Sequence, residues 1–255
     1  MKLANRIAIV TGADYGIGQA IATLYAQEGA DICIGYHTDL DGAEATRRAV
    51  EAAGRKAVVV QGDVGNPRDV AALFEAAAGL GVVDVLVNNA GKGMGGTPVD
   101  ELEDEMVELI LRTDLMGPLF CCREFIRLRK KQGGKGRIVT ISSVAQHLPT
   151  AGSAPYGMAK AGVGSLTRSL AVELAPHKIN VNNIAPGLIQ TPMTQDTLDD
   201  PQKKEKSMQE IPWHRPGQPE EIAALALFLA ADTGDYVTGQ TWVMDGGLTM
   251  NWGGA

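Results

Sequence analysis

Three residues with proton-transfer chemistry lie close together in the sequence: Ser143, Tyr156 and Lys160. Tyr156 and Lys160 are four residues apart, so on a helix they share one face. A phenol has a pKa of about 10, and a cation held beside it lowers that pKa toward the neutral range. Ser143 follows an apolar run, where its hydroxyl could hold a substrate oxygen. The spacing therefore indicates a proton-transfer site, although by itself it also fits a surface tyrosine above a solvated lysine.

Apolar runs typical of buried strands alternate with helical segments along all 255 residues. This alternation predicts a single α/β domain over residues 1–255, with a mainly parallel seven-stranded sheet and helices on both faces. Strands are expected over 7–10, 32–36, 57–61, 83–88, 137–142, 179–184 and 241–245. Helices are expected over about 19–28, 40–53, 67–78, 100–129 with a break near Gly117 and Pro118, 156–175 and 220–230.

The distinctive polar and glycine-rich segments all follow predicted strands. In doubly wound sheets, ligands bind beyond the carboxyl ends of the strands, where the strand order changes direction. We therefore expect one site at that edge of the sheet. The segments that would form it are the turn 11–18, Asp63, residues 88–91, Ser143, and Pro186 with Gly187.

The turn after the first strand has glycines at positions 12, 16 and 18 and leads into a helix. Glycines let the backbone approach a pyrophosphate, and the free N–H groups at the helix start favour its negative charge. Gly12, Gly16 and Gly18 thus indicate a dinucleotide cradle. A plain strand-to-helix connection is the alternative for such a turn considered alone.

Composition and charge exclude several other classes of protein. The net charge of −7 argues against a nucleic acid or an anionic membrane as partner. Cys33, Cys121 and Cys122 lie in apolar runs without metal-ligand spacing, so we expect buried free thiols, no metal and a reducing compartment. The sequence begins directly with a predicted strand, and no apolar run is long enough to cross a membrane. A cytoplasmic protein is therefore expected.

The prolines and charges of residues 188–218 suggest a different kind of segment. No strand or helix is expected there, and we interpret it as a substrate lid that is poorly ordered without ligand. Met193, Met208 and Trp213, with the loop 144–154 and its His147 and Leu148, are expected to form the walls of the substrate pocket.

Taken together, these motifs resemble the short-chain dehydrogenase/reductase family. The resemblance rests on Thr11-Gly-x-x-x-Gly-Ile-Gly18, Asp63-Val64, Asn88-Asn-Ala-Gly91, Ser143, Tyr156-x-x-x-Lys160 and Pro186-Gly187, in the family's order. The C-terminal half resembles glucose 1-dehydrogenases and 3-oxoacyl-carrier-protein reductases most. The resemblance implies a Rossmann fold, a nicotinamide cofactor and a homotetramer. It also implies hydride transfer to or from a carbonyl or secondary alcohol, and leaves open whether the substrate is a ketone, a sugar or a 3-oxoacyl compound.

The resemblance also implies a role for each matching residue. Tyr156 would be the general acid or base, Lys160 would lower its pKa and hold the nicotinamide ribose, and Ser143 would bind the substrate oxygen. The implied cofactor-binding residues are Gly12, Asp14, Tyr15, Gly16, Ile17 and Gly18 in the turn; Tyr36, His37 and Thr38 after the second strand; Asp63 and Val64 at the adenine; Asn89, Ala90 and Gly91 at the adenosine ribose; Pro186, Gly187, Ile189 and Thr191 at the nicotinamide; and Tyr156 and Lys160 themselves.

Asp114 departs from the family pattern, which has Asn at this position and uses it to link the lysine to solvent. Asp is nearly the same shape, but an ionised carboxylate only accepts hydrogen bonds. It would also compete with the phenolate for the lysine charge. Asp114 either preserves the local helix distortion with little effect on activity, or it weakens proton transfer. The second possibility leaves open a catalytically weak dinucleotide-binding protein as an alternative function.

The end of the second strand bears on the choice of cofactor. NAD-specific folds have an acid there that binds the ribose 2′-hydroxyl and repels a 2′-phosphate. Here the expected position is the neutral Tyr36, and His37 and Thr38 can donate hydrogen bonds to phosphate. Asp39 is close enough in sequence to turn toward the ribose instead. The sequence favours NADP(H), with NAD(H) also accepted.

Overall fold

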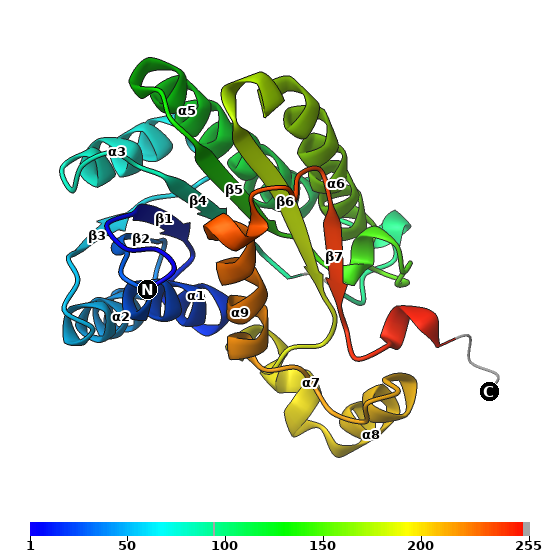
Figure 1. The fold of residues 1–255 in the computed structure, drawn as a ribbon. Helices are drawn as coiled ribbons and strands as arrows, with labels where there is room; N and C mark the ends of the chain where they lie inside the picture. Colours follow the sequence, from blue (N-terminus) through cyan, green and yellow to red (C-terminus); the bar gives the residue numbers. More distant parts are fainter. Residues whose placement is uncertain (94, 252–255) are drawn as a thin grey trace.

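The sheet is parallel throughout and has the strand order β3-β2-β1-β4-β5-β6-β7. The computed structural model describes residues 1–93 and 95–251. The predicted Rossmann arrangement is confirmed (Figure 1). The strands are β1 (Ile7–Thr11), β2 (Asp31–Tyr36), β3 (Ala57–Gln61), β4 (Val85–Asn88), β5 (Gly136–Ile141), β6 (Ile179–Pro186) and β7 (Thr241–Met244).

Helices cover both faces of the sheet (Figure 1). On one face, α1 (Gly16–Gln27), α2 (Leu40–Ala52) and α9 (Pro219–Ala230) pack over one cluster of buried apolar side chains. On the other, α3 (Pro67–Ala78), α5 (Gly117–Gln132) and α6 (Ala154–Leu174) cover a second cluster. β1, β2 and β4 are almost entirely buried, which explains why they read as apolar runs rather than alternating ones. The edge strands β3 and β7 are partly exposed.

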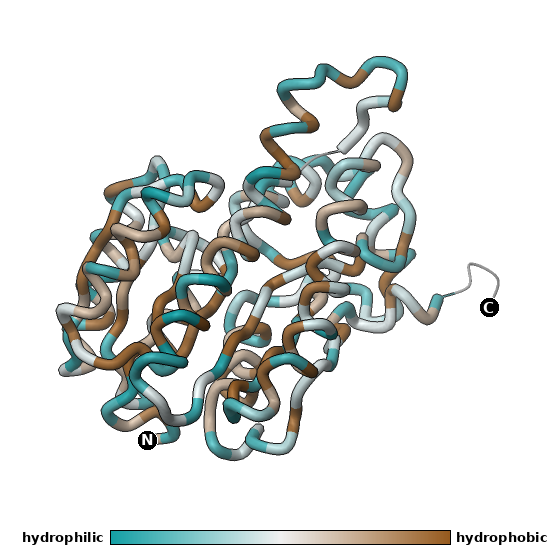
Figure 2. The backbone as a smooth tube through the Cα atoms, turned by 90° about the horizontal axis from the view of Figure 1, so that it is seen from above, coloured by the Kyte–Doolittle hydropathy of each residue, from teal (hydrophilic) through white to brown (hydrophobic). Residues whose placement is uncertain are grey.

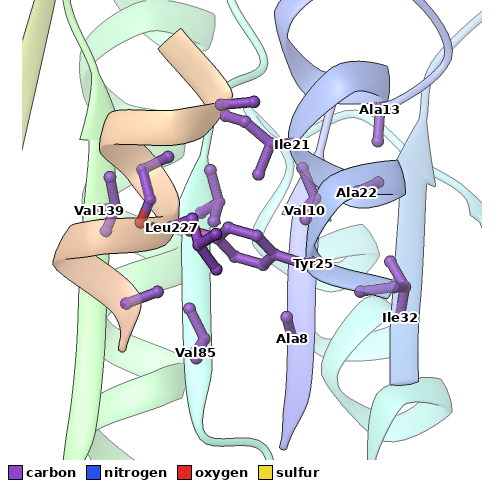
Figure 3. Close-up of a cluster of buried hydrophobic side chains, with 14 of the residues drawn as sticks. Ala8, Val10, Ala13, Ile21, Ala22, Tyr25, Ile32, Val85, Val139 and Leu227 are labelled. Carbon is purple, nitrogen blue, oxygen red and sulfur yellow. Dashed lines mark hydrogen bonds between the residues drawn. The ribbon is translucent and has the colours of Figure 1, made fainter. Parts of the chain in front are cut away.

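Helices α1 and α9 come from opposite ends of the chain, and Tyr25 joins them (Figure 3). Its ring is completely buried, and its hydroxyl donates a hydrogen bond of 2.8 Å to the carbonyl oxygen of Ala226. A buried phenol needs such a partner because an unpaired hydroxyl is costly away from water. This contact fixes the helix that begins at the glycine turn against the C-terminal part of the fold.

The predicted helix over 100–129 is divided into several parts. A 3₁₀ turn at Val99–Glu101 precedes α4 (Asp104–Leu111), so the expected start at residue 100 is wrong. The break expected near Gly117 is confirmed as a π-helical segment, Arg112–Met116, that ends where α5 begins. Seen from above, the chain from residue 95 into α4 extends away from the body of the molecule (Figure 2). The π segment turns Asp114 into the interior, where its side chain is completely buried.

The segment 188–218 contains two helices that the sequence reading missed. They are α7 (Gln195–Asp199) and α8 (Pro201–Glu210). Asp200 caps α8, because its carboxylate accepts hydrogen bonds from the N–H groups of Gln202 and Lys203. With Pro201 at the first helical position, this is a standard helix start. The expectation that this segment has no helix is therefore wrong, because Pro201 begins one.

The two ends of that segment are held together by backbone hydrogen bonds. The Gly217 N–H donates to the Leu188 carbonyl oxygen, and the Gln190 N–H donates to the Gly217 carbonyl oxygen, both at 2.9 Å. Between these ends, α7 and α8 form an excursion whose residues are mostly exposed. The excursion is therefore tied to the body at a narrow base.

Candidate active site

A cavity of about 320 Å³ opens at the carboxyl ends of the strands. The strand order changes direction between β1 and β4, and loops from both strands contribute to its wall. The wall includes residues from the glycine turn, from the ends of β2 and β3, from the segment after β4, and from α6. Ligands of parallel α/β sheets bind at this kind of crevice.

The glycine turn has the geometry of a phosphate cradle. Gly12 and Gly16 have φ angles of 60° and 56°, a region that side chains disfavour. A Cβ on Gly12 would lie 2.9 Å from the Cα of Ala90, and one on Gly16 would lie 3.1 Å from Cγ2 of Thr191. Helix α1 starts with neither a side-chain cap nor an acidic residue in its first turn. Its free N–H groups and its dipole therefore suit the pyrophosphate of a dinucleotide.

Thr11 and Asn89 hold this turn against the end of β4. The Asn89 side-chain amide donates to the carbonyl oxygens of Thr11 and Gly12, at 3.0 and 2.7 Å. The Thr11 hydroxyl accepts from the N–H groups of Asn89 and Ala90, both at 3.0 Å. The sequence identified Asn89 as a cofactor contact but did not predict this supporting role, since the partner atoms are 77 to 79 positions away in the chain.

Nearly all of the candidate residues meet at the cavity. Gly18 does not line it, because it is packed against the carbonyl oxygen of Gly12, where a side chain would not fit. Those that do line it are Gly12, Asp14, Tyr15, Gly16, Ile17, Tyr36, His37, Thr38, Asp63, Val64, Asn89, Ala90, Gly91, Asp114, Ser143, Tyr156, Lys160, Pro186, Gly187, Ile189 and Thr191.

Of the expected substrate-pocket walls, only part lies at this cavity. Met193 lines it, but Met208, Trp213 and the loop 144–154, with Leu148 and the exposed His147, do not. The cavity also has lining residues that the sequence did not identify, among them Lys92, Leu109, Ser142 and Thr194. These residues belong to no recognisable sequence motif, and only the tertiary fold brings them to the cavity.

Ser143, Tyr156 and Lys160 come from β5 and α6 to one end of the cavity. Lys160 Nζ lies 5.3 Å from the centre of the Tyr156 ring, which is the shared face predicted from their spacing. Ser143 lies two residues beyond β5, and its side-chain oxygen accepts a hydrogen bond of 3.2 Å from the Ala145 N–H. That bond orients the Ser143 side chain and leaves its hydroxyl hydrogen available.

Asp114 forms a buried ion pair with Lys160. Its Oδ2 lies 3.1 Å from Lys160 Nζ, and both side chains are almost completely inaccessible to solvent. Its Oδ1 accepts a hydrogen bond of 2.7 Å from the Lys92 N–H. The lysine therefore has a permanent counter-charge in addition to its contact with Tyr156.

The ion pair decides the charge state of the lysine. Burial by itself would lower the pKa of Lys160, but the negative charge of Asp114 and the nearby Tyr156 oppose it, and the net effect is a raised pKa. Lys160 is thus held as a cation although it is only 4% exposed.

At the other end of the cavity, the side chains after β2 surround the place expected for the adenosine ribose. Tyr36 is nearly buried, and His37 and Thr38 follow it along the wall. Asp39 caps α2, because its carboxylate accepts a hydrogen bond of 2.9 Å from the Gly42 N–H. If Asp39 turned toward the ribose, as the alternative has it, α2 would lose this capping hydrogen bond.

Comparisons with known proteins agree with this geometry. Residues 12–249 match the family model described as enoyl-(acyl carrier protein) reductase. The chain is 39% identical to 3beta-hydroxysteroid dehydrogenase 1 of Eggerthella lenta, over 97% of this chain and 95% of the relative. It is 36% identical to a glucose 1-dehydrogenase of Gluconobacter oxydans, over 98% and 94%.

A solved structure of acetoin dehydrogenase from Enterobacter cloacae superposes with a TM-score of 0.88 at 40% identity, covering 97% of this chain and 96% of that one. The family model, these relatives and the parallel sheet agree with one another. The chain belongs to the short-chain dehydrogenase/reductase family of NAD(P)-dependent oxidoreductases.

Proposed function

We propose that this protein transfers a hydride between a nicotinamide cofactor and a carbonyl or secondary alcohol, with Ser143, Tyr156 and Lys160 as the catalytic residues. The observation that carries the proposal is the meeting of this tyrosine and its buried lysine with the glycine turn in one cavity. A nicotinamide ring bound there would supply the hydride chemistry.

Each residue has a proposed task at the reacting carbon–oxygen group. The Tyr156 hydroxyl gives a proton to the substrate oxygen in reduction and takes it back in oxidation. Ser143 donates a hydrogen bond to that oxygen, which stabilises the charge that develops on it. Lys160 remains protonated beside the phenol and favours its ionised form.

We propose a ketone or its secondary alcohol as substrate. Leu109 and Met193 line the cavity and are partly exposed, and such apolar side chains favour a ketone with hydrocarbon substituents over a sugar. The relatives named for acetoin, a hydroxysteroid and glucose indicate that the family accepts varied CH–OH groups. A panel of ketones, 3-oxoacyl thioesters and sugars, followed at 340 nm with both cofactors, tests this.

The same assay separates this proposal from its alternative, a dinucleotide-binding protein without useful turnover. The alternative is supported by the Asp114–Lys160 ion pair, which draws the lysine charge away from Tyr156. Cofactor binding without turnover of any panel member would favour the alternative. Turnover that depends on cofactor would favour the enzyme.

For the nucleotide we propose NADP(H) as the preferred cofactor, with NAD(H) accepted. The support is the neutral Tyr36 in place of an acid, followed by two hydrogen-bond donors, His37 and Thr38, on the cavity wall. The ratio of kcat/KM for the two cofactors, in the wild type and in His37→Ala, measures this preference. A wild type that prefers NAD(H) by about tenfold, or 1.4 kcal/mol, and does not respond to loss of His37 contradicts it.

Asp114→Asn should move the pH optimum to lower pH. Without the carboxylate, the lowering effect of burial on the pKa of Lys160 is less opposed, so the ammonium loses its proton at lower pH. The alkaline limb of the pH–rate profile then shifts to the acid side. At pH values where Lys160 stays protonated, its charge then acts on Tyr156 without a competing Asp114 carboxylate, so turnover should rise. An unchanged profile would mean that Asp114 serves only the π-helical geometry.

We propose that the excursion between Leu188 and Gly217 is a lid that closes over substrate. Its narrow base and the presence of Thr191, Met193 and Thr194 on the cavity wall support this. In hydrogen exchange, the amides of α7 and α8 should be protected when cofactor and substrate are both present, because closure excludes water. Equal protection without ligand would rule out the lid.

A homotetramer is proposed from the family and from the edge of the sheet. Among residues 1–93 and 95–251, β7 is the edge strand beside β6, and Trp242 and Val243 on it are partly exposed, which self-association could cover. We propose that the tail from Leu248 onward, with Trp252, adds to this interface; Trp252 lies outside the described residues. Sedimentation at assay concentration should give the mass of four chains, and a monomer would contradict the proposal.

We also propose that the protein is cytoplasmic. All three cysteines are buried and unpaired, as thiols in a reducing compartment are. Within residues 1–93 and 95–251, no helix is long and apolar enough to cross a membrane.

A further inference from the structure

The glycine turn carries a carboxylate at the ribose end of the cavity. Asp14 lines the cavity together with Tyr36, His37 and Thr38, and it is only 5% exposed. Burial raises the pKa of Asp14, and the negative charge of Asp39 raises it further, while His37 acts in the opposite direction. The side chains of Asp14, Asp39 and His37 therefore interact electrostatically across one small region.

Asp14 is fixed in this position by the contacts of the turn with α2. The Thr46 hydroxyl donates a hydrogen bond of 2.8 Å to the Ala13 carbonyl oxygen. The Ala13 N–H donates one of 3.0 Å to the Gly35 carbonyl oxygen at the end of β2. These bonds hold the turn between β2 and the first turns of α2, so the carboxylate is not a mobile surface group.

Asp39 lies immediately behind Asp14. At Gly42 an added Cβ would meet both the backbone oxygen of Asp14 and, at 2.5 Å, the Oδ2 of Asp39, so only glycine fits between them. Burial raises the pKa of Tyr15, and the charges of Asp14 and Asp39 raise it further. This end of the cavity thus has the Asp14 carboxylate and His37 on its wall and the Asp39 carboxylate behind them.

We infer that Asp14, with Asp39 behind it, determines cofactor specificity by acting against a ribose 2′-phosphate and in favour of a 2′-hydroxyl. The inference rests on the proposed dinucleotide site. A 2′-hydroxyl can donate a hydrogen bond to a carboxylate. A 2′-phosphate is itself an anion with a charge of about −1.5 to −2 near neutral pH, so it is repelled instead. Asp14 therefore offsets the advantage that Tyr36, His37 and Thr38 give to NADP(H).

The test is direct titration of NAD⁺ and NADP⁺ by calorimetry, which needs no substrate. In Asp14→Asn, the ratio of the NAD⁺ to the NADP⁺ dissociation constant should rise about tenfold over the wild type, as expected from losing one like charge at close range. Asp41→Asn is the matched control. Asp41 is an exposed carboxylate in the first turn of α2 and does not line the cavity, so its loss should leave the ratio unchanged.

Asp39→Asn is the second variant, since an asparagine keeps the cap of α2. It should shift the ratio of dissociation constants in the same direction by a smaller factor. If Asp14→Asn does not fold, Asp39→Asn still tests the inference. A ratio in both variants equal to that of Asp41→Asn overturns the inference while leaving the dinucleotide site intact. Failure of the wild type to bind either dinucleotide overturns the proposed function as well.

Discussion

Replacement of Tyr156 by phenylalanine is expected to lower kcat by about 10²–10⁴-fold, the usual contribution of a general acid or base. The phenyl ring keeps the shape of the side chain and its contact with Lys160, whose ammonium lies 5.3 Å from the ring centre. Cofactor affinity should therefore change little. Turnover and NAD(P)⁺ binding are measured on the same preparation, so the loss is attributed to proton transfer rather than to binding.

Tyr236→Phe is the matched control for this change. Tyr236 is fully exposed, and it does not line the cavity. The control should retain normal turnover and a normal melting temperature. Substantial activity in the Tyr156 variant, at a level comparable with this control, would show that the proton is transferred by another group.

Lys160→Met should affect turnover, cofactor binding and stability together. Methionine retains most of the side-chain volume but leaves the Asp114 carboxylate buried without its ion-pair partner. Removal of one partner of a buried ion pair typically lowers the free energy of unfolding by about 3–5 kcal/mol. Turnover is lost because Tyr156 no longer has a cation beside it, and NAD(P)⁺ affinity falls if Lys160 also holds the ribose.

A double variant separates the structural effect from the chemical one. Lys160→Met combined with Asp114→Asn removes the stranded charge, so denaturant unfolding should show much of the stability regained. Turnover should stay as low as in the single variant. Recovery of turnover in the double variant would mean that Lys160 acts only by neutralising Asp114, and the proposed role of its charge at Tyr156 would be wrong.

The strands and the position of the site could be read from the sequence because both follow local rules. A buried parallel strand must be apolar along its length, and all seven predicted strands are present with small shifts at their ends. The turn glycines were recognisable because only glycine tolerates the φ angles of residues 12 and 16 and the close approach of Ala90 and Thr191. Parallel strands then bring their carboxyl ends to one edge.

The excursion 188–218 could not be read in the same way. α8 is charged on nearly all sides and buries little, so it has no apolar period to reveal it. The sequence feature that indicates α8 is the capping pair Asp200-Pro201, and these two residue types are also common in loops. The 3₁₀ turn before α4 was missed because helix boundaries depend on a few local hydrogen bonds rather than on a pattern.

The sequence by itself determined the family, the sheet and the motif residues that line the cavity, except Gly18. The departure of Asp114 from the family pattern already pointed to an interaction with Lys160, but only the tertiary structure gave the distance and burial of that ion pair and brought Asp14 close to Asp39. Asp114 and Lys160 are 46 positions apart and Asp14 and Asp39 are 25 apart, counted from their numbers in the sequence. The π-helical segment directs Asp114 into the interior, where it contacts Lys160. The packing of the glycine turn against α2 brings Asp14 close to Asp39. Electrostatic interactions depend on distance and burial in space, and the sequence order of the residues contains neither.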